Sequence, residues 1–141
     1  MKTFLKFISL NYFFSCTLLC FILLTGFLFP QAGTLDNSFG NDGIVTTAIG
    51  SSLSRIKDIA IQSDGKIVAA GRSDNGALSD CALARYNSDG SLDNTFGSGG
   101  ITTFGEAIIN AIVILPDGKI VAAGYTGDYL DKLLVLIRFN S

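Results

Sequence analysis

One octapeptide occurs twice, unchanged, in this chain of 141 residues. Residues Asp64–Gly71 and Asp117–Gly124 both read Asp-Gly-Lys-Ile-Val-Ala-Ala-Gly, and the step from position 64 to position 117 is 53 residues. Eight identical residues at a fixed spacing indicate an internal duplication. Repeats of this length are typical of proteins built from stacked structural units. The chain is therefore expected to fold as two copies of one unit.

A second repeated block opens each unit. Gly33–Gly40 and Gly90–Gly97 share the pattern Gly-x-Leu-Asp-Asn-x-Phe-Gly, at a spacing of 57 from position 33 to position 90. The second unit is thus shorter by four residues before its Asp-Gly-Lys block, in a region that a change of length marks as a surface loop. We place the units at residues 33–89 and 90–141.

Each unit is predicted to form four short strands. The Asp-Gly pair lies between apolar runs, which is a strong signal for a β-hairpin. The predicted strands are Gly43–Thr47, Ile56–Gln62, Lys66–Arg72 and Asp80–Tyr86 in the first unit, and Gly100–Thr103, Ile109–Leu115, Lys119–Tyr125 and Leu133–Phe139 in the second.

The third strand of each unit indicates how the sheets pack. Ile67–Gly71 is a continuous apolar run, whereas a sheet with one wet face would alternate apolar and polar side chains. Sheets that avoid water on both faces must stack on other sheets, and four strands per unit matches a β-propeller blade. The predicted fold is all-β, with two four-stranded antiparallel propeller-like blades after an N-terminal apolar helix.

Two blades make an incomplete propeller, because closed propellers have about 4 to 8 blades. Three explanations follow from this: the chain is a fragment of a longer propeller, a truncated gene product, or a subunit that other copies complete.

The repeated blocks resemble those of the delta-60 repeat family of bacterial proteins. The family pattern includes Gly-x-Leu-Asp-x-x-Phe-Gly, Asp-Gly-Lys-Ile-Val-x-x-Gly and Leu-x-Arg-[Tyr/Phe]-Asn-x-Asp-Gly. The third block stands here as Leu83–Gly90 and, in part, as Leu136–Ser141. The resemblance covers nearly everything after the leader and implies an extracytoplasmic β-propeller, but it supplies no reaction.

Residues 1–32 have the character of an export signal. Lys2 and Lys6 give a positive start, and an apolar run follows over residues 8–29. The run suits a signal peptide, and it is also long enough to span a bilayer. The segment is therefore a cleaved signal peptide or an uncleaved N-terminal membrane anchor. Either way the remainder is expected to be periplasmic, on the cell surface or secreted.

Charge and composition exclude several classes of function. The net charge is −2, and removing the two leader lysines leaves 8 basic against 12 acidic residues. No basic patch is present to bind nucleic acid. The chain has no histidine, so Ser-His-Asp and Cys-His sites cannot form within it. Cys81 lies in an apolar pattern outside the leader, apart from Cys16 and Cys20, and is expected to be a buried small hydrophobe.

The repeated arginines Arg85 and Arg138 are the strongest candidates for a polar site. They could face a central channel and hold an anion, or they could pair with a repeated aspartate of the next turn. We favour the structural pairing. The candidate partners are Asp64, Asp93 and Asp117.

Other candidate sites are better explained by local structure. Asn87–Asp93 resembles a calcium loop but has Arg85 where an acidic ligand should stand, so a hairpin turn is expected. The loop from Asp74 to Asp80 is expected to be solvated, and Gly97–Gly100 leads into a strand and is a turn rather than a phosphate loop. Phe39 and Phe96 are expected to be wedges between units.

These observations favour an exported, non-catalytic repeat protein that serves as a scaffold or binding surface. No catalytic, cofactor or metal site is predicted. A paired-carboxylate hydrolase is the catalytic scheme left open, although Glu106, the only glutamate, lies in the loop that changes length. The alternatives are a fragment of a larger propeller enzyme or a truncated gene remnant. A protein or glycan partner is expected, or self-association through the exposed flanks of the blades.

Overall fold

The computed structural model describes residues 32–51, 53–74, 79–127 and 130–141. The chain divides into an N-terminal part, Met1–Thr34, and a main domain, Leu35–Ser141. Almost all of the N-terminal part lies outside the described residues, and with it the predicted leader, its apolar helix, Cys16 and Cys20. In the described part of the chain no helix is long or apolar enough to cross a membrane.

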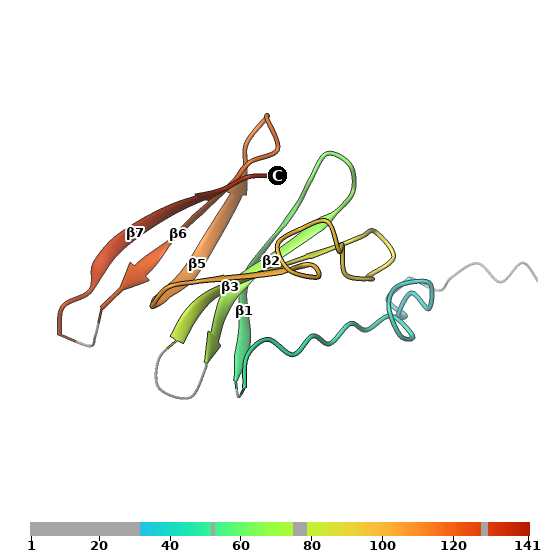
Figure 1. Ribbon diagram of the computed structural model, residues 1–141. Helices are drawn as coiled ribbons and strands as arrows, with labels where there is room; N and C mark the ends of the chain where they lie inside the picture. The colour runs from blue at the N-terminus through green and yellow to red at the C-terminus, as the bar shows by residue number, and fades with distance from the viewer. Residues whose placement is uncertain (1–31, 52, 75–78, 128–129) are drawn as a thin grey trace, which may run out of the picture. The chain divides into compact units, whose positions relative to one another are not determined.

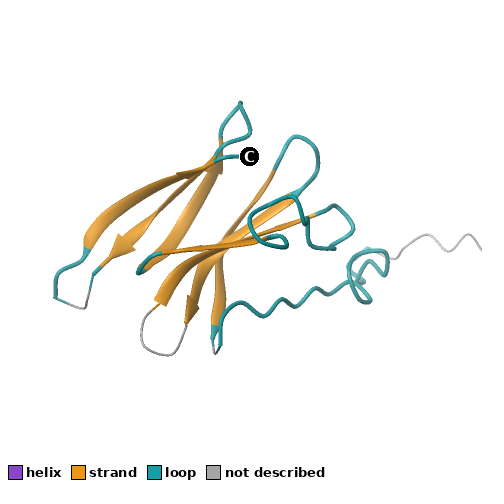
Figure 2. Ribbon diagram, in the orientation of Figure 1, coloured by secondary structure: helices purple, strands orange, loops and turns teal. Residues whose placement is uncertain are grey.

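The main domain is all-β, as the sequence predicts, and its described part contains strands and loops without a helix (Figure 2). Two antiparallel sheets are formed. Sheet 1 has the strand order β1-β2-β3-β4, and sheet 2 has the order β5-β6-β7 (Figure 1). The strands are β1 (Ser54–Ile61), β2 (Ile67–Asp74), β3 (Ser79–Tyr86), β4 (Ile101–Phe104), β5 (Ala107–Ile114), β6 (Ile120–Thr126) and β7 (Leu133–Phe139).

The sheets are out of phase with the sequence repeats by one strand. The predicted strand Gly100–Thr103 is present as β4, but it pairs with β3 of sheet 1 instead of opening sheet 2. The predicted strand Gly43–Thr47 is wrong: the segment has only an isolated bridge between Asn41 and Ile44. Sheet 1 therefore takes three strands from the first repeat and one from the second, and sheet 2 has three strands.

The Asp-Gly hairpins form as predicted, with a three-residue loop. The amide of Gly65 donates to the carbonyl of Gln62, and the amide of Gln62 donates to the carbonyl of Lys66. Gly65 has φ +84° and Gly118 has φ +82°. Both lie in the left-handed region that glycine adopts without a steric penalty, which is why glycine closes this turn.

The octapeptide ends in a glycine because another backbone approaches it. β1 and β5 each have a bulge, between Ile56 and Asp58 and between Ile109 and Ala111. A Cβ built on Gly71 would lie 1.9 Å from the carbonyl oxygen of Arg55. Gly124 has the same clash with Ile108. Neither position can hold a larger residue without displacing the bulged strand.

The two sheets pack face to face around one apolar cluster. Sheet 1 contributes Val68, Ala70, Cys81 and Leu83, and sheet 2 contributes Ala107, Ile109, Ile120 and Ala122 with Ile112, Ile114, Val135, Ile137 and Phe139 at its border. In each sheet we call one face the forward face and the opposite face the rear face. The forward face carries Val68 and Leu83 in sheet 1 and their equivalents Val121 and Leu136 in sheet 2. Within one molecule, the forward face of sheet 1 meets the rear face of sheet 2.

The rear face of sheet 1 is covered only in part. A second cluster there contains Ala69, Ala84 and Tyr86, and Val45 and Ile49 pack on it. We call residues 44–51, which precede β1, the extended segment. The hydroxyl of Tyr86 donates to the Thr47 hydroxyl at 2.8 Å, which ties this segment to the sheet. The prediction that Val68 avoids water is confirmed, since it is fully buried.

Candidate functional site

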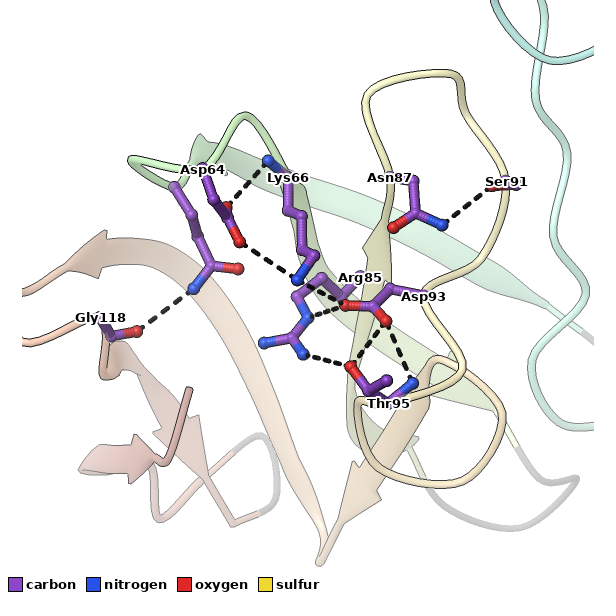
Figure 3. A network of polar contacts seen from close by, with 9 residues as sticks. Asp64, Lys66, Arg85, Asn87, Ser91, Asp93, Thr95 and Gly118 are labelled. Carbon is purple, nitrogen blue, oxygen red and sulfur yellow. Dashed lines mark hydrogen bonds and ion pairs between the residues drawn. The ribbon is translucent and has the colours of Figure 1, made fainter.

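The repeated arginine of the first repeat forms a buried ion pair with an aspartate of the second repeat. Arg85 lies near the end of β3 and Asp93 lies in the loop that leads to β4. The Arg85 Nε donates to Asp93 Oδ2 at 2.8 Å, and both side chains are 6% exposed (Figure 3). The predicted structural pairing of Arg85 is confirmed, and Asp93 is the partner among the three candidates.

Thr95 completes the site on the other side of the carboxylate. Its amide and hydroxyl both donate to Asp93 Oδ1, at 3.1 and 2.7 Å. These two bonds, followed by the charge and hydrogen bond of Arg85, hold the pKa of Asp93 well below its usual range. The Arg85 Nη2 in turn donates to the Thr95 hydroxyl at 3.2 Å.

Lys66 connects the site to the repeated octapeptide. Its ammonium lies 3.4 Å from Asp93 Oδ2 and 3.1 Å from Asp64 Oδ2 (Figure 3). The hydrogen bond to Asp64 is the main cause of the raised pKa of Lys66. The network thus joins the β1–β2 turn, β3 and the start of the second repeat.

Phe96 lies beneath the ion pair and belongs to the apolar cluster between the sheets. Its ring is 4.6 Å from the guanidinium carbon of Arg85, which is within the range of a cation–π contact. The predicted wedge role of Phe96 is confirmed. Phe39, its equivalent, is only half-buried.

Both carboxylate oxygens of Asp93 are therefore engaged by protein donors. The site holds the start of the second repeat against sheet 1 so that β4 can pair with β3. This geometry favours positioning of the backbone over anion capture.

The second repeated arginine lies in different surroundings. Arg138, on β7, is exposed, and no carboxylate pairs with it in the described part of the chain. Asp117, which the sequence offers as a partner, instead pairs with Lys119.

The Asn87–Asp93 segment is a hairpin turn, as predicted. The amide of Asn87 donates to the carbonyl of Ser91, and the amide of Gly90 donates to the carbonyl of Asn87. Asp89 Oδ1 accepts from the amide and hydroxyl of Ser91 at 2.9 and 2.6 Å. The side chains that resemble calcium ligands are thus used to close the turn.

The remaining candidates are scattered. Asp74 pairs with Arg72 at 3.5 Å and accepts from the Ser79 hydroxyl at 2.5 Å, while residues 75–78 of that loop lie outside the described residues. Glu106 is exposed in the turn between β4 and β5. Gly97–Gly100 is the predicted turn, closed by a bond from the Gly100 amide to the Phe96 carbonyl at 2.9 Å. The residues that the structure describes bring no three potential metal ligands together.

Cys81 is fully buried on the forward face of sheet 1, as predicted. Burial raises the pKa of its thiol, and the thiol donates to the carbonyl of Phe104 at 3.0 Å. A buried, protonated thiol is a poor nucleophile.

Sequence reasoning missed two polar contacts that bridge the sheets. Asp58 Oδ2 accepts from the amide of Ile112 at 2.8 Å, and Gln62 Nε2 donates to the carbonyl of Gly118 at 3.3 Å. Asp58 lies directly after the bulge in β1, and its partner lies after the matching bulge in β5. The signal available in the sequence is that Ala111 and Leu115 replace these two polar residues in the second repeat.

A hollow with a volume of about 320 Å³ lies on the rear face of sheet 1. Small side chains of β2 and β3 form its floor, and the extended segment forms one wall. Its lining includes Val45, Thr46, Thr47, Ile56, Ala69 and Ala84.

Similarity to a known family agrees with this architecture. No curated protein and no solved structure matches the chain. A family model described as a domain of unknown function (DUF5122) beta-propeller matches residues 62–96 and 115–141. These two stretches contain the two Asp-Gly-Lys blocks and most of the network around Arg85, so the similarity indicates a β-propeller-type domain built from repeats.

Proposed function

We propose that this chain is an exported, non-catalytic repeat module of the delta-60 type that serves as a scaffold or binding surface. The similarity to a β-propeller family model supports the repeat architecture. The observation that carries the proposal is the use of the repeated polar residues. Arg85 and Lys66 both pair with Asp93, so these side chains connect the two repeats to each other.

The surface offers sheet faces for binding. The rear face of sheet 1 is hollowed and carries Ile56, Ile59 and Ile61, which are 66%, 59% and 69% exposed. Monomeric soluble proteins rarely leave large contiguous apolar patches in water, and such patches mark interaction sites. A protein or glycan partner, or a second copy of the chain, would be held by this surface through contacts with apolar and small side chains.

Export is tested by fusing a reporter enzyme that folds only outside the cytoplasm after Ser141 of the full chain. The apolar run with its leading lysines is the basis for export. We expect reporter activity in intact bacteria, and loss of that activity when Leu18, Leu19 and Leu23 are changed together to Asp. Equal activity from both fusions would contradict export.

The non-catalytic role is tested on the full chain with two panels. Immobilised glycans and peptides report binding, and chromogenic glycosides and esters report hydrolysis. We expect retention of the chain on one of the binding surfaces and no turnover. Turnover that disappears in Glu106→Gln but persists in Asp42→Asn would assign a hydrolase and overturn the proposal.

A further inference from the structure

We propose that the forward face of sheet 2 in one copy of this chain docks on the rear face of sheet 1 in a second copy, and that residues 44–47 of the second copy pair with β7 of the first. The contact would repeat, between two molecules, the contact that already exists between the two sheets of one molecule. It assigns the rear face of sheet 1 to a second copy of the chain, so a protein or glycan partner of the assembled copies would bind another surface.

The forward faces of the two sheets have equivalent residues in opposite environments. Leu83 in sheet 1 is fully buried against sheet 2, whereas its equivalent Leu136 is 76% exposed. Cys81 is likewise buried, and its equivalent Leu134 is 96% exposed. The second repeat thus keeps large apolar side chains at the positions that bury a neighbouring sheet in the first.

The rear faces show the converse. Ile109 in sheet 2 is fully buried against sheet 1, whereas its equivalent Ile56 in sheet 1 is 66% exposed. The two open faces therefore carry the same residue classes as the two halves of the internal contact. A forward face and a rear face from separate copies are complementary, and two forward faces are not.

The edge of β7 supplies a second match. In sheet 1, β4 pairs with β3 through Leu83 with Thr102 and Ala84 with Ile101. The equivalents of these four residues are Leu136, Val45, Ile137 and Ile44. β7 pairs with β6, and on its other edge no strand is bound in the described part of the chain.

Part of the segment 44–47 already lies on the rear face of sheet 1. Val45 and Ile49 pack on the rear face of sheet 1. This is the face on which the second copy would receive sheet 2 of the first, so docking would bring the segment alongside β7. Antiparallel addition of an extended segment to an open edge is a recurrent mode of recognition.

Charges at the same edge are also complementary. Asp36 is the equivalent of Asp93, and its Oδ1 accepts from the amide and hydroxyl of Ser38 at 2.9 and 2.6 Å, as Asp93 does from Thr95. Arg138 is the equivalent of Arg85. Arg138 of the first copy and Asp36 of the second copy would therefore lie on opposite sides of the proposed contact, as equivalents of Arg85 and Asp93.

One difference from the internal contact is informative. Asp58 and Gln62 bridge the two sheets of one molecule, and their equivalents on the forward face are Ala111 and Leu115. The contact between copies therefore depends on apolar burial and on strand pairing. Substitutions on the apolar faces should break it.

The test uses two variants of the full chain, purified in mild detergent. Leu136→Glu damages only the forward face and Ile59→Glu only the rear face, and both side chains are exposed within one copy. We expect the unchanged chain to associate, each variant alone to have a dissociation constant raised at least about tenfold, and an equimolar mixture of the two variants to form one-to-one dimers that do not extend.

Light scattering after size exclusion measures the masses, and circular dichroism confirms that each variant is folded. Leu130→Glu is the matched control, because Leu130 is 86% exposed in the loop between β6 and β7. It should associate like the unchanged chain. The proposal is overturned if the unchanged chain is monomeric at 100 µM or above, if the control also dissociates, or if the mixed variants remain monomeric.

Discussion

At the scale of single residues, identical sequences take different roles because their surroundings differ. Val68 and Val121 occupy the same position of the repeated octapeptide, yet Val68 is fully buried and Val121 is half-buried. The difference arises because the forward face of sheet 1 meets sheet 2, and no described residue covers the forward face of sheet 2 in the same way. Position within the stack decides the burial of each residue.

This asymmetry can be measured at the equivalent residues Leu83 and Leu136. Leu83→Ala should lower the free energy of unfolding by about 2–5 kcal/mol, because it leaves a cavity in the shared cluster. Leu136→Ala should change the stability of a dilute, monomeric sample by less than about 0.5 kcal/mol. Urea unfolding at low protein concentration makes the comparison, and equal losses would show that β7 is already covered within one molecule.

The depressed pKa of Asp93 makes stability depend on pH. A carboxyl whose pKa is lowered by folding adds stability above its unfolded value of about 3.9, and that stability is lost as the pH falls toward the folded value. The free energy of unfolding should therefore decrease between about pH 4 and pH 2.

Asp93→Asn should be less stable at neutral pH and should show a flatter decrease in acid. Asp36→Asn is the control, because Asp36 forms the same kind of turn with Ser38 that Asp93 forms with Thr95, and no cation pairs with Asp36 in the described part of the chain. Its pKa is lowered through the Ser38 hydroxyl and amide. Denaturant titrations across this pH range make the test. A curve for Asp93→Asn as steep as that of the unchanged chain would rule out this aspartate as a source of the acid sensitivity.

At the scale of elements, both Asp-Gly hairpins and every predicted strand except Gly43–Thr47 could be predicted from the sequence, whereas the assignment of strands to sheets could not. The Asp-Gly turns, the apolar runs and the buried Cys81 follow from local pattern and period. The pairing of β4 with β3 is accompanied by the contact of Arg85 with Asp93, and both contacts join residues of different repeats. Local periodicity contains no information on which neighbour a strand joins.

The sequence also could not predict the bridge from Asp58 to Ile112. An aspartate in an otherwise apolar strand has the pattern of a solvent-exposed residue. Its role depends on two bulges that face each other in the folded unit, and a bulge is a feature of strand pairing.

The bridge between the sheets can be tested by removing its acceptor. Asp58→Ala leaves the Ile112 amide without its 2.8 Å partner and should lower the free energy of unfolding by about 1–3 kcal/mol. Asp58→Asn retains an oxygen acceptor and should lose less. Hydrogen exchange at the Ile112 amide provides a local readout, since the exchange should accelerate in the alanine variant. An unchanged rate would show that the bond does not protect this amide.

The glycine at the end of the octapeptide gives a second prediction for the bulges. Gly71→Ala would place a Cβ 1.9 Å from the Arg55 carbonyl oxygen, so the bulged strand must shift. We expect a loss of about 1–3 kcal/mol in the free energy of unfolding, as for other overpacked sites. Gly65→Ser serves as the comparison, because nothing lies within 4 Å of a Cβ there and its cost comes from φ alone. A Gly71→Ala variant as stable as the unchanged chain would contradict the close approach.

At the scale of the whole molecule, the open faces link stability to concentration. If copies associate head to tail, binding stabilises the folded state by mass action, and the thermal midpoint should rise with protein concentration. Contacts of this kind close into rings when the rotation between subunits permits it. With about 4 to 8 blades in a ring and two sheets per copy, the closed assembly would contain about two to four copies. Native mass spectrometry would count them.

The offset between repeat and sheet has a consequence for how such chains change in length. β4 belongs by sequence to the second repeat, but it is hydrogen-bonded to the sheet that precedes it. Every newly inserted repeat would therefore supply the strand that joins it to the preceding sheet. Duplication of a gene segment would then add a sheet through the same kind of contact. The same offset leaves sheet 2 with three strands and would allow the number of sheets to change during evolution while the contacts between neighbouring sheets stay the same.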